Sequence, residues 1–175
     1  MEENNHPAFM PSLVSGLMLG VLLVIYSLVL YLFDLNENIW LSSVSYLITG
    51  AFLFYAITSF RDNKQNGLLS FGKGVGLGTL IGFFASLILA LFIYVYITYV
   101  DPGVIEEAMI RAEESVLQSQ PDISDADLDN AMEIVEIFTS PGIMASMSII
   151  WYTMVSVVFS LLISIFAKRE DINIA

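Results

Sequence analysis

Four long apolar stretches follow one another along the chain, separated by polar segments. They cover about residues 12–33, 39–60, 74–100 and 142–167, and none of them contains Asp, Glu, Lys, Arg or His. About 20 consecutive apolar residues are enough for a helix to cross the hydrocarbon core of a bilayer. The pattern therefore predicts an all-α integral membrane bundle of four transmembrane helices, forming one domain over residues 1–175.

The first apolar stretch is predicted to be a retained membrane helix. A secretory signal peptide begins with a positively charged region, whereas this stretch is preceded by Glu2 and Glu3 and by no Lys or Arg. Its small residues Ser12, Gly16 and Gly20 are spaced four apart, so they share one face of the helix.

The third apolar stretch has a longer face of small residues. Gly74, Gly78, Gly82, Ser86 and Ala90 recur at every fourth position. Lipid tails are as apolar as Leu, so burial alone does not drive membrane helices together, and small residues are typical of the faces where helices pack closely. These five residues are predicted to form a helix-packing face.

The fourth apolar stretch repeats the same spacing with polar side chains. Ser148, Tyr152, Ser156, Ser160 and Ser164 follow one another at every fourth position. Such hydroxyls commonly donate to a backbone carbonyl one turn back, and this face either packs against a helix or lines a polar path. The faces of the third and fourth stretches either meet each other inside the bundle or each receive a partner helix.

The segment from 101 to 141 is the only sizeable polar part between the apolar stretches. Apolar residues recur at helical spacing on both sides of Pro121, which predicts two amphipathic helices joined as a hairpin. Asp101 is predicted to cap the first helix, with Pro102 at its first helical position, and Ser124 is predicted to cap the second. The apolar face of this hairpin is predicted to rest on the membrane domain or on a partner. Its residues are Ile105, Ala108, Met109, Ala112 and Val116, then Leu128, Ala131, Met132, Val135 and Phe138.

This insert is strongly acidic, with eleven acidic residues and one basic residue, Arg111. Most of the carboxylates are predicted to lie on a solvated face, including Glu106, Glu107, Glu113, Glu114, Asp125, Asp127 and Asp129. The aspartates lack the Gly that an EF-hand loop needs at its sixth position. Whether the acidic insert binds cations or a protein is left open by the sequence.

Charge placement predicts the orientation of the chain. Five of the six basic residues lie in the 61–73 loop and at Lys168 and Arg169. Short loops rich in Lys and Arg remain in the cytoplasm. Both termini are therefore predicted to be cytoplasmic, and the acidic hairpin is predicted to be extracytoplasmic.

Composition narrows the possible chemistry. The chain has no Cys and one His, His6, so a thiol nucleophile or a thiolate metal site is excluded. A formal net charge of −12 argues against binding nucleic acid, which requires a basic surface. We expect no cofactor, no metal centre and no enzymatic activity.

Three short motifs occur in a recognisable order. They are Leu69 to Gly74 (LSFGKG), Asp101 to Gly103 (DPG) and Ser140 to Met144 (SPGIM). Together they resemble a family of small four-helix membrane proteins from Bacteroidetes-type bacteria, catalogued as domain of unknown function number four-one-nine-nine. The resemblance implies a bacterial cytoplasmic (inner) membrane location, and it supplies no activity or site residue.

These observations predict a non-enzymatic role as an accessory, scaffold or assembly component. The small-residue face of the third apolar stretch, the serine-rich face of the fourth and the projecting amphipathic insert are surfaces that other helices can pack against. They favour binding to membrane-protein partners, or to further copies of the chain, within membrane lipid. The alternative is a small transporter or channel for a neutral solute, with the serine-rich face of the fourth stretch lining the path.

Overall fold

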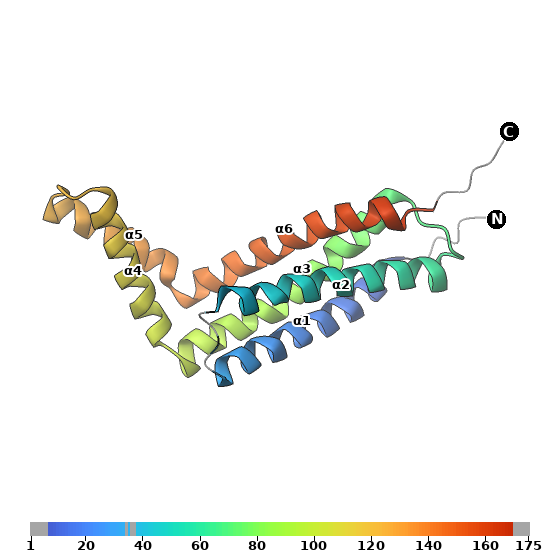
Figure 1. Cartoon of the computed structure of the whole chain (residues 1–175), viewed down its shortest axis with the longest axis horizontal. Helices are drawn as coiled ribbons and strands as arrows, with labels where there is room; N and C mark the ends of the chain where they lie inside the picture. Colours follow the sequence, from blue (N-terminus) through green and yellow to red (C-terminus); the bar gives the residue numbers. More distant parts are fainter. Residues whose placement is uncertain (1–6, 34, 36–37, 170–175) are drawn as a thin grey trace. The chain divides into compact units, whose positions relative to one another are not determined.

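The computed structural model describes residues 7–33, 35 and 38–169, and this part of the chain is helical. The chain divides into two compact units, residues 1–89 with 149–175, and residues 90–148. The elements, shown in Figure 1, are α1 (Phe9–Leu32), α2 (Ile39–Lys64), α3 (Phe71–Val95), the π-helix η1 (Tyr96–Val100), α4 (Gly103–Ser119), α5 (Asp125–Thr139) and α6 (Pro141–Ala167).

Four of these helices are long and apolar enough to cross a membrane. They are α1, α2, α6 and the continuous helix Phe71–Val100, which joins α3 and η1. The all-α prediction and the four long apolar helices are confirmed. The boundaries differ by a few residues: α2 runs past the predicted end at residue 60 to Lys64, because the polar segment after Phe60 continues the same helix.

Side-chain caps and a tight turn define the ends of α2. The Asn38 side chain accepts hydrogen bonds from the backbone N–H groups of Trp40 and Leu41, at 3.1 and 3.3 Å. This satisfies two of the donors that a helix start leaves without partners. After Lys64 the chain turns through Asn66 and Gly67, both with positive φ (52° and 81°). The left-handed conformation costs Gly little, which suits it to this turn.

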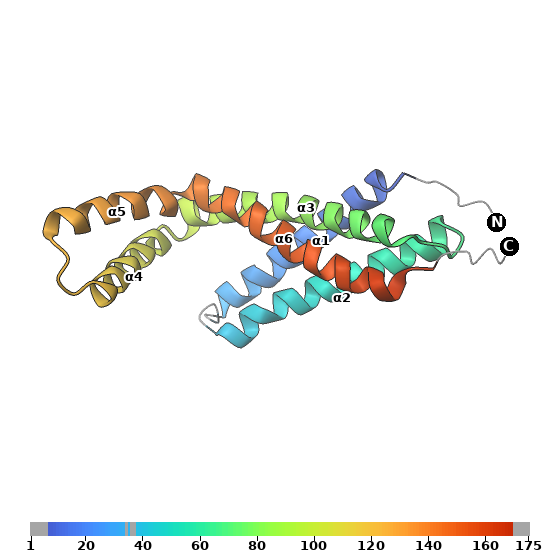
Figure 2. The same cartoon turned by 90° about the horizontal axis from the view of Figure 1, so that it is seen from above.

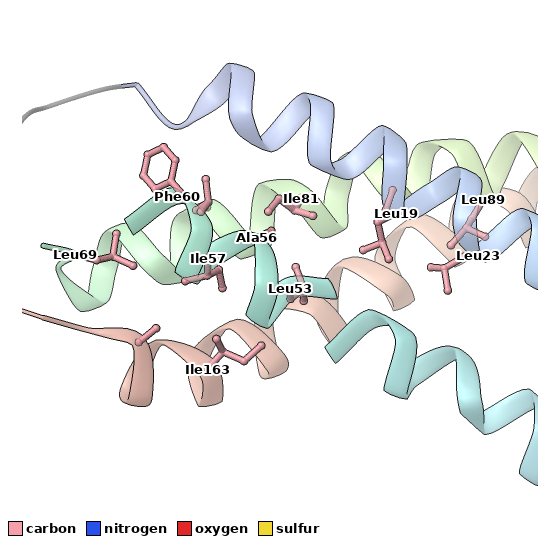
Figure 3. Packing of buried hydrophobic residues seen from close by; sticks show 13 residues of the cluster. Leu19, Leu23, Leu53, Ala56, Ile57, Phe60, Leu69, Ile81, Leu89 and Ile163 are labelled. Atoms are coloured by element: carbon pink, nitrogen blue, oxygen red, sulfur yellow. The ribbon is translucent and has the colours of Figure 1, made fainter. Parts of the chain in front are cut away.

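The core of the first unit is a cluster of aliphatic side chains. Figure 3 shows Leu19 of α1, Leu53 and Ile57 of α2, and Ile81 of α3 pointing into it. All four are fully buried. The outward faces of α2 and α6 are also apolar, as for Leu47 (70% exposed), Phe54, Leu162 and Phe166. A protein surrounded by water rarely exposes this much apolar surface. Contact with apolar lipid tails makes such exposure favourable.

In the second unit, α4 and α5 run side by side and pack against each other (Figure 2). Neither helix contains a fully buried residue. Ser124 caps α5 as predicted, since its Oγ accepts from the N–H of Asp127 at 3.3 Å. The predicted cap of α4 is wrong: Pro102 occupies the cap position, α4 begins at Gly103, and the Asp101 carboxylate accepts instead from the Tyr96 hydroxyl at 3.2 Å.

The sequence predicts one membrane domain over residues 1–175, with residues 101–141 as an insert within it. This domain assignment stays a prediction.

Candidate functional site

The small-residue face of α3 and the serine stripe of α6 meet inside the first unit. Each glycine lies opposite one serine, and the pairs advance in steps of four along two antiparallel helices. The pairs are Gly74 with Ser164, Gly78 with Ser160, and Gly82 with Ser156. We call these six residues the glycine–serine seam.

The two helices approach too closely in the seam for a larger residue to fit without movement. A Cβ atom added to Gly74 would lie 2.6 Å from the Ser164 Oγ, and one added to Gly78 or Gly82 would overlap the side chain of the facing serine. Ser160 and Ser164 are completely buried. Both helices therefore depend on residues with little or no side chain at these positions.

The hydroxyl groups near the seam bond mainly to their own helices. Ser160 donates to the carbonyl of Ser156 at 2.6 Å, which is the back-bonding expected of a hydroxyl in a membrane helix. Ser86 donates to the Phe83 carbonyl at 2.7 Å, and its Oγ also lies 3.4 Å from the Thr153 Oγ1. This last contact crosses from α3 to α6 and extends the seam by one turn.

Ser164 is an exception among the seam hydroxyls. Its Oγ is buried and has no hydrogen-bond partner in the part of the chain that the structure describes. It faces the backbone of Gly74, whose Cα carries no side chain. A Cα–H···O contact is the weak interaction available at such a position.

The remaining residues of the two predicted faces are placed differently. Tyr152 is half-buried and packs against the core of the first unit. Ala90 and Ser148 belong to the second unit. Ala90 is buried, and Ser148 donates to the Ala145 carbonyl at 2.7 Å.

The small residues of α1 pack on a second face of α3. The Ser12 hydroxyl donates to the Leu77 carbonyl at 3.3 Å. A Cβ added to Gly16 would lie 2.7 Å from the Ile81 carbonyl oxygen, and the face continues one turn later at Gly20. Residues of α1 thus pair with residues 65 positions later in the sequence, so α1 and α3 run parallel. The helix α3 therefore packs against α6 on one face and against α1 on another.

The last turn of α2 and the loop that follows it are hydrogen-bonded to the end of α6. Arg61, which is 9% exposed, donates from Nη1 to the Ala167 carbonyl at 3.0 Å and forms a bidentate pair with Asp62 at 2.7 and 3.1 Å. Leu69 and Arg169 exchange two backbone hydrogen bonds at 2.8 and 2.9 Å. These contacts bring the five basic residues of the first unit to one end of it: Arg61, Lys64, Lys73, Lys168 and Arg169.

The predicted acidic residues of the second unit are exposed on α4 and α5, at Glu106, Glu107, Glu113, Glu114, Asp125, Asp127 and Asp129. Arg111 pairs with Glu107 at 3.4 Å across one helical turn. The Asp127 carboxylate accepts from the Ser124 hydroxyl at 2.7 Å. Within residues 7–33, 35 and 38–169, no three His, Cys, Asp or Glu side chains come together as a metal site.

An exposed apolar row on α4 and α5 was not predicted from the sequence. It consists of five large side chains that are 42–57% exposed: Ile110, Leu117, Ile134, Ile137 and Phe138. The spacing of Ile134, Ile137 and Phe138, at i, i+3 and i+4, is a signal for one helix face. The sequence places Phe138 on an apolar face of this helix that is predicted to rest on the membrane domain or a partner; its ring is 54% exposed, and this placement stays a prediction.

Comparison with known families identifies this chain. The family model described as Protein of unknown function (DUF4199) matches residues 15–169. The chain belongs to this family. The resemblance predicted from the three ordered motifs is thereby confirmed. No curated protein and no solved structure matches the chain.

The DUF4199 match covers the whole glycine–serine seam, the basic end of the first unit and both helices of the second unit. The source of the chain among Bacteroidetes-type bacteria stays a prediction.

Proposed function

We propose that this chain is a multi-pass membrane protein that acts as a non-enzymatic scaffold, binding another membrane protein through α4 and α5. The exposed apolar row defined above is the observation that carries the proposal. Its members Ile134, Ile137 and Phe138 share one face of α5 by their spacing, and large apolar side chains exposed together on one face mark sites of protein interaction. The first unit anchors the chain, and the second presents the binding surface.

Membrane insertion is supported by the outer surface of the first unit. Leu47, Phe54, Leu162 and Phe166 are at least half exposed on helices long enough to cross a bilayer. The clustering of five basic residues at one end supports a cytoplasmic location for that end. Both termini would then be cytoplasmic, α4 and α5 extracytoplasmic, and the location a bacterial inner membrane.

Packing of the serine stripe supports a scaffold rather than a transporter. A path for a neutral solute would need the stripe to face water. Ser156, Ser160 and Ser164 are instead at most 2% exposed and face glycines of α3. The serines that transport would use are buried where two helices pack against each other.

The chemistry of the exposed row indicates the kind of partner. Ile134 and Ile137 lie on the same helix as the exposed carboxylates Asp125, Asp127 and Asp129. A complementary surface would have an apolar centre and a rim of Lys or Arg, since opposite charges around an interface favour association. We expect this surface on the extracytoplasmic part of a membrane protein.

The test is purification of the tagged chain from its native host in a mild detergent, read by native mass spectrometry. We expect a second membrane protein in fixed ratio to the chain. The double variant Ile134→Ser with Phe138→Ser should lose it, and Gln118→Ala, at an exposed polar position of α4, should keep it. A monomer, a complex of identical chains, or a partner retained by the double variant would contradict the proposal.

A further inference from the structure

A groove runs between α1 and α2 on the outer surface of the first unit. Its polar part, roughly 280 Å³, is lined by Ser15, Ser59, Asn63 and Lys64 among other residues. Its apolar part, roughly 500 Å³, is lined on α1 by Leu17, Val21, Leu22 and Ile25. Met18 and Phe52 line both parts, so the two parts are continuous.

The apolar part of the groove is close in length to the hydrocarbon of one lipid leaflet. It follows α1 from Leu17 to Ile25, which at 1.5 Å per residue is about 12 Å of helix. One leaflet contributes about 15 Å, half of the ~30 Å hydrocarbon core. An acyl chain lying along α1 would fill the apolar part and leave the polar part for the groups at its head.

The charges at the polar end favour an anion. Lys64 is exposed at the mouth of the groove, and it lies at the end of the unit where the basic residues gather. The nearest carboxylate in the sequence, Asp62, is already paired with Arg61. Asn63 donates to the Ser59 hydroxyl at 3.1 Å, so the groups beside Lys64 are hydrogen-bonding groups of the kind that contact ester and phosphate oxygens.

We propose that this groove binds one anionic glycerophospholipid, with an acyl chain along Val21 and Leu22 and the phosphate at Lys64. A purely apolar occupant would leave Ser59, Asn63 and Lys64 without a role. A soluble anion would leave the long apolar part empty. A phospholipid matches both parts of the groove in the order in which they occur.

The test is native mass spectrometry of the whole chain in detergent, titrated with phosphatidylglycerol or with phosphatidylcholine of the same acyl chains. We expect phosphatidylglycerol to bind about fivefold more tightly, the effect of one Lys near an anionic headgroup. Lys64→Gln should abolish this preference. Lys168→Gln removes the same charge from the same end but outside the groove, and it should leave the preference unchanged.

A second variant tests the apolar part. Val21→Trp fills the groove from an exposed position and should reduce binding of both lipids at least threefold, while the melting temperature stays within a few degrees of wild type. The proposal is overturned by equal binding of the two lipids to wild type, by equal effects of Lys64→Gln and Lys168→Gln, or by unchanged lipid binding in a folded Val21→Trp.

Discussion

Gly78 of α3 and Ser160 of α6 face each other so closely that a Cβ atom on Gly78 would overlap the Ser160 side chain. Ser160 is fully buried, and its hydroxyl bonds back to the Ser156 carbonyl. This pair is the middle step of the glycine–serine seam. It explains why two helices with small, regularly spaced residues are found in the same chain: each helix supplies one side of a single interface.

Enlarging Gly78 should destabilise the first unit. Gly78→Ile forces a branched side chain against Ser160 and Ile57, and overpacking of this kind costs about 1–3 kcal/mol or more. Thermal unfolding in detergent measures the effect. Gly76→Ile is the matched control, because Gly76 is on the same helix and a Cβ there meets nothing within 4 Å. Equal melting temperatures for the two variants would refute the seam.

The loss of melting temperature caused by replacing a glycine with alanine should depend on which atoms surround that glycine. At Gly16 an added Cβ would meet the Ile81 carbonyl oxygen at 2.7 Å, and backbone atoms cannot rotate away. At Gly74 it meets mainly the Ser164 hydroxyl, which can adopt another rotamer. We therefore expect Gly16→Ala to lower the melting temperature more than Gly74→Ala, and Gly72→Ala to be neutral. The reverse order would show that α1 is not held as closely to α3 as described.

Removing the Arg61 side chain should loosen the end of α6. Arg61 satisfies the Ala167 carbonyl in the last turn of that helix, and losing a hydrogen bond from a buried charged donor costs about 1–3 kcal/mol. Arg61→Gln should lower the melting temperature and increase hydrogen exchange near Ala167. Lys168→Gln removes an exposed charge next to Ala167 in the sequence, and it is the control for the change in net charge. Identical exchange in the two variants would rule out this role for Arg61.

The orientation of the chain can be tested with a single thiol, because the natural sequence contains no Cys. Ser119, at the exposed end of α4, is proposed to be extracytoplasmic. Ser119→Cys should react with a membrane-impermeant maleimide in spheroplasts, and Lys168→Cys should react only after lysis. Protection of Ser119→Cys before lysis would invert the topology.

The periodicity of α3 was enough to predict a packing face, because spacing by four places small residues together on any helix. The sequence did not identify the partner of that face. A glycine face accepts any helix that comes close, so the choice of α6 depends on the register that the whole first unit adopts. The same holds for the Leu69–Arg169 bridge, which joins residues 100 positions apart.

The two predicted helix caps of the second unit differ in outcome because one depends on neighbouring residues alone and the other does not. Ser124 was predictable as a cap because its hydroxyl needs only the N–H of Asp127, three residues away. Asp101 was not, because its carboxylate bonds to Tyr96 through the turn that follows η1.

The most direct test of the seam is a disulfide between Gly74→Cys and Ser164→Cys. A Cβ on Gly74 would lie 3.2 Å from the Ser164 Cβ, close to the 3.5–4.5 Å that a disulfide spans. After mild oxidation and trypsin cleavage at Arg111, we expect the α3 and α6 fragments of one chain to remain joined, with no cross-linked dimer. Gly76→Cys with Ser164→Cys should stay unlinked. A dimer linked between chains, or no link at all, would contradict the account.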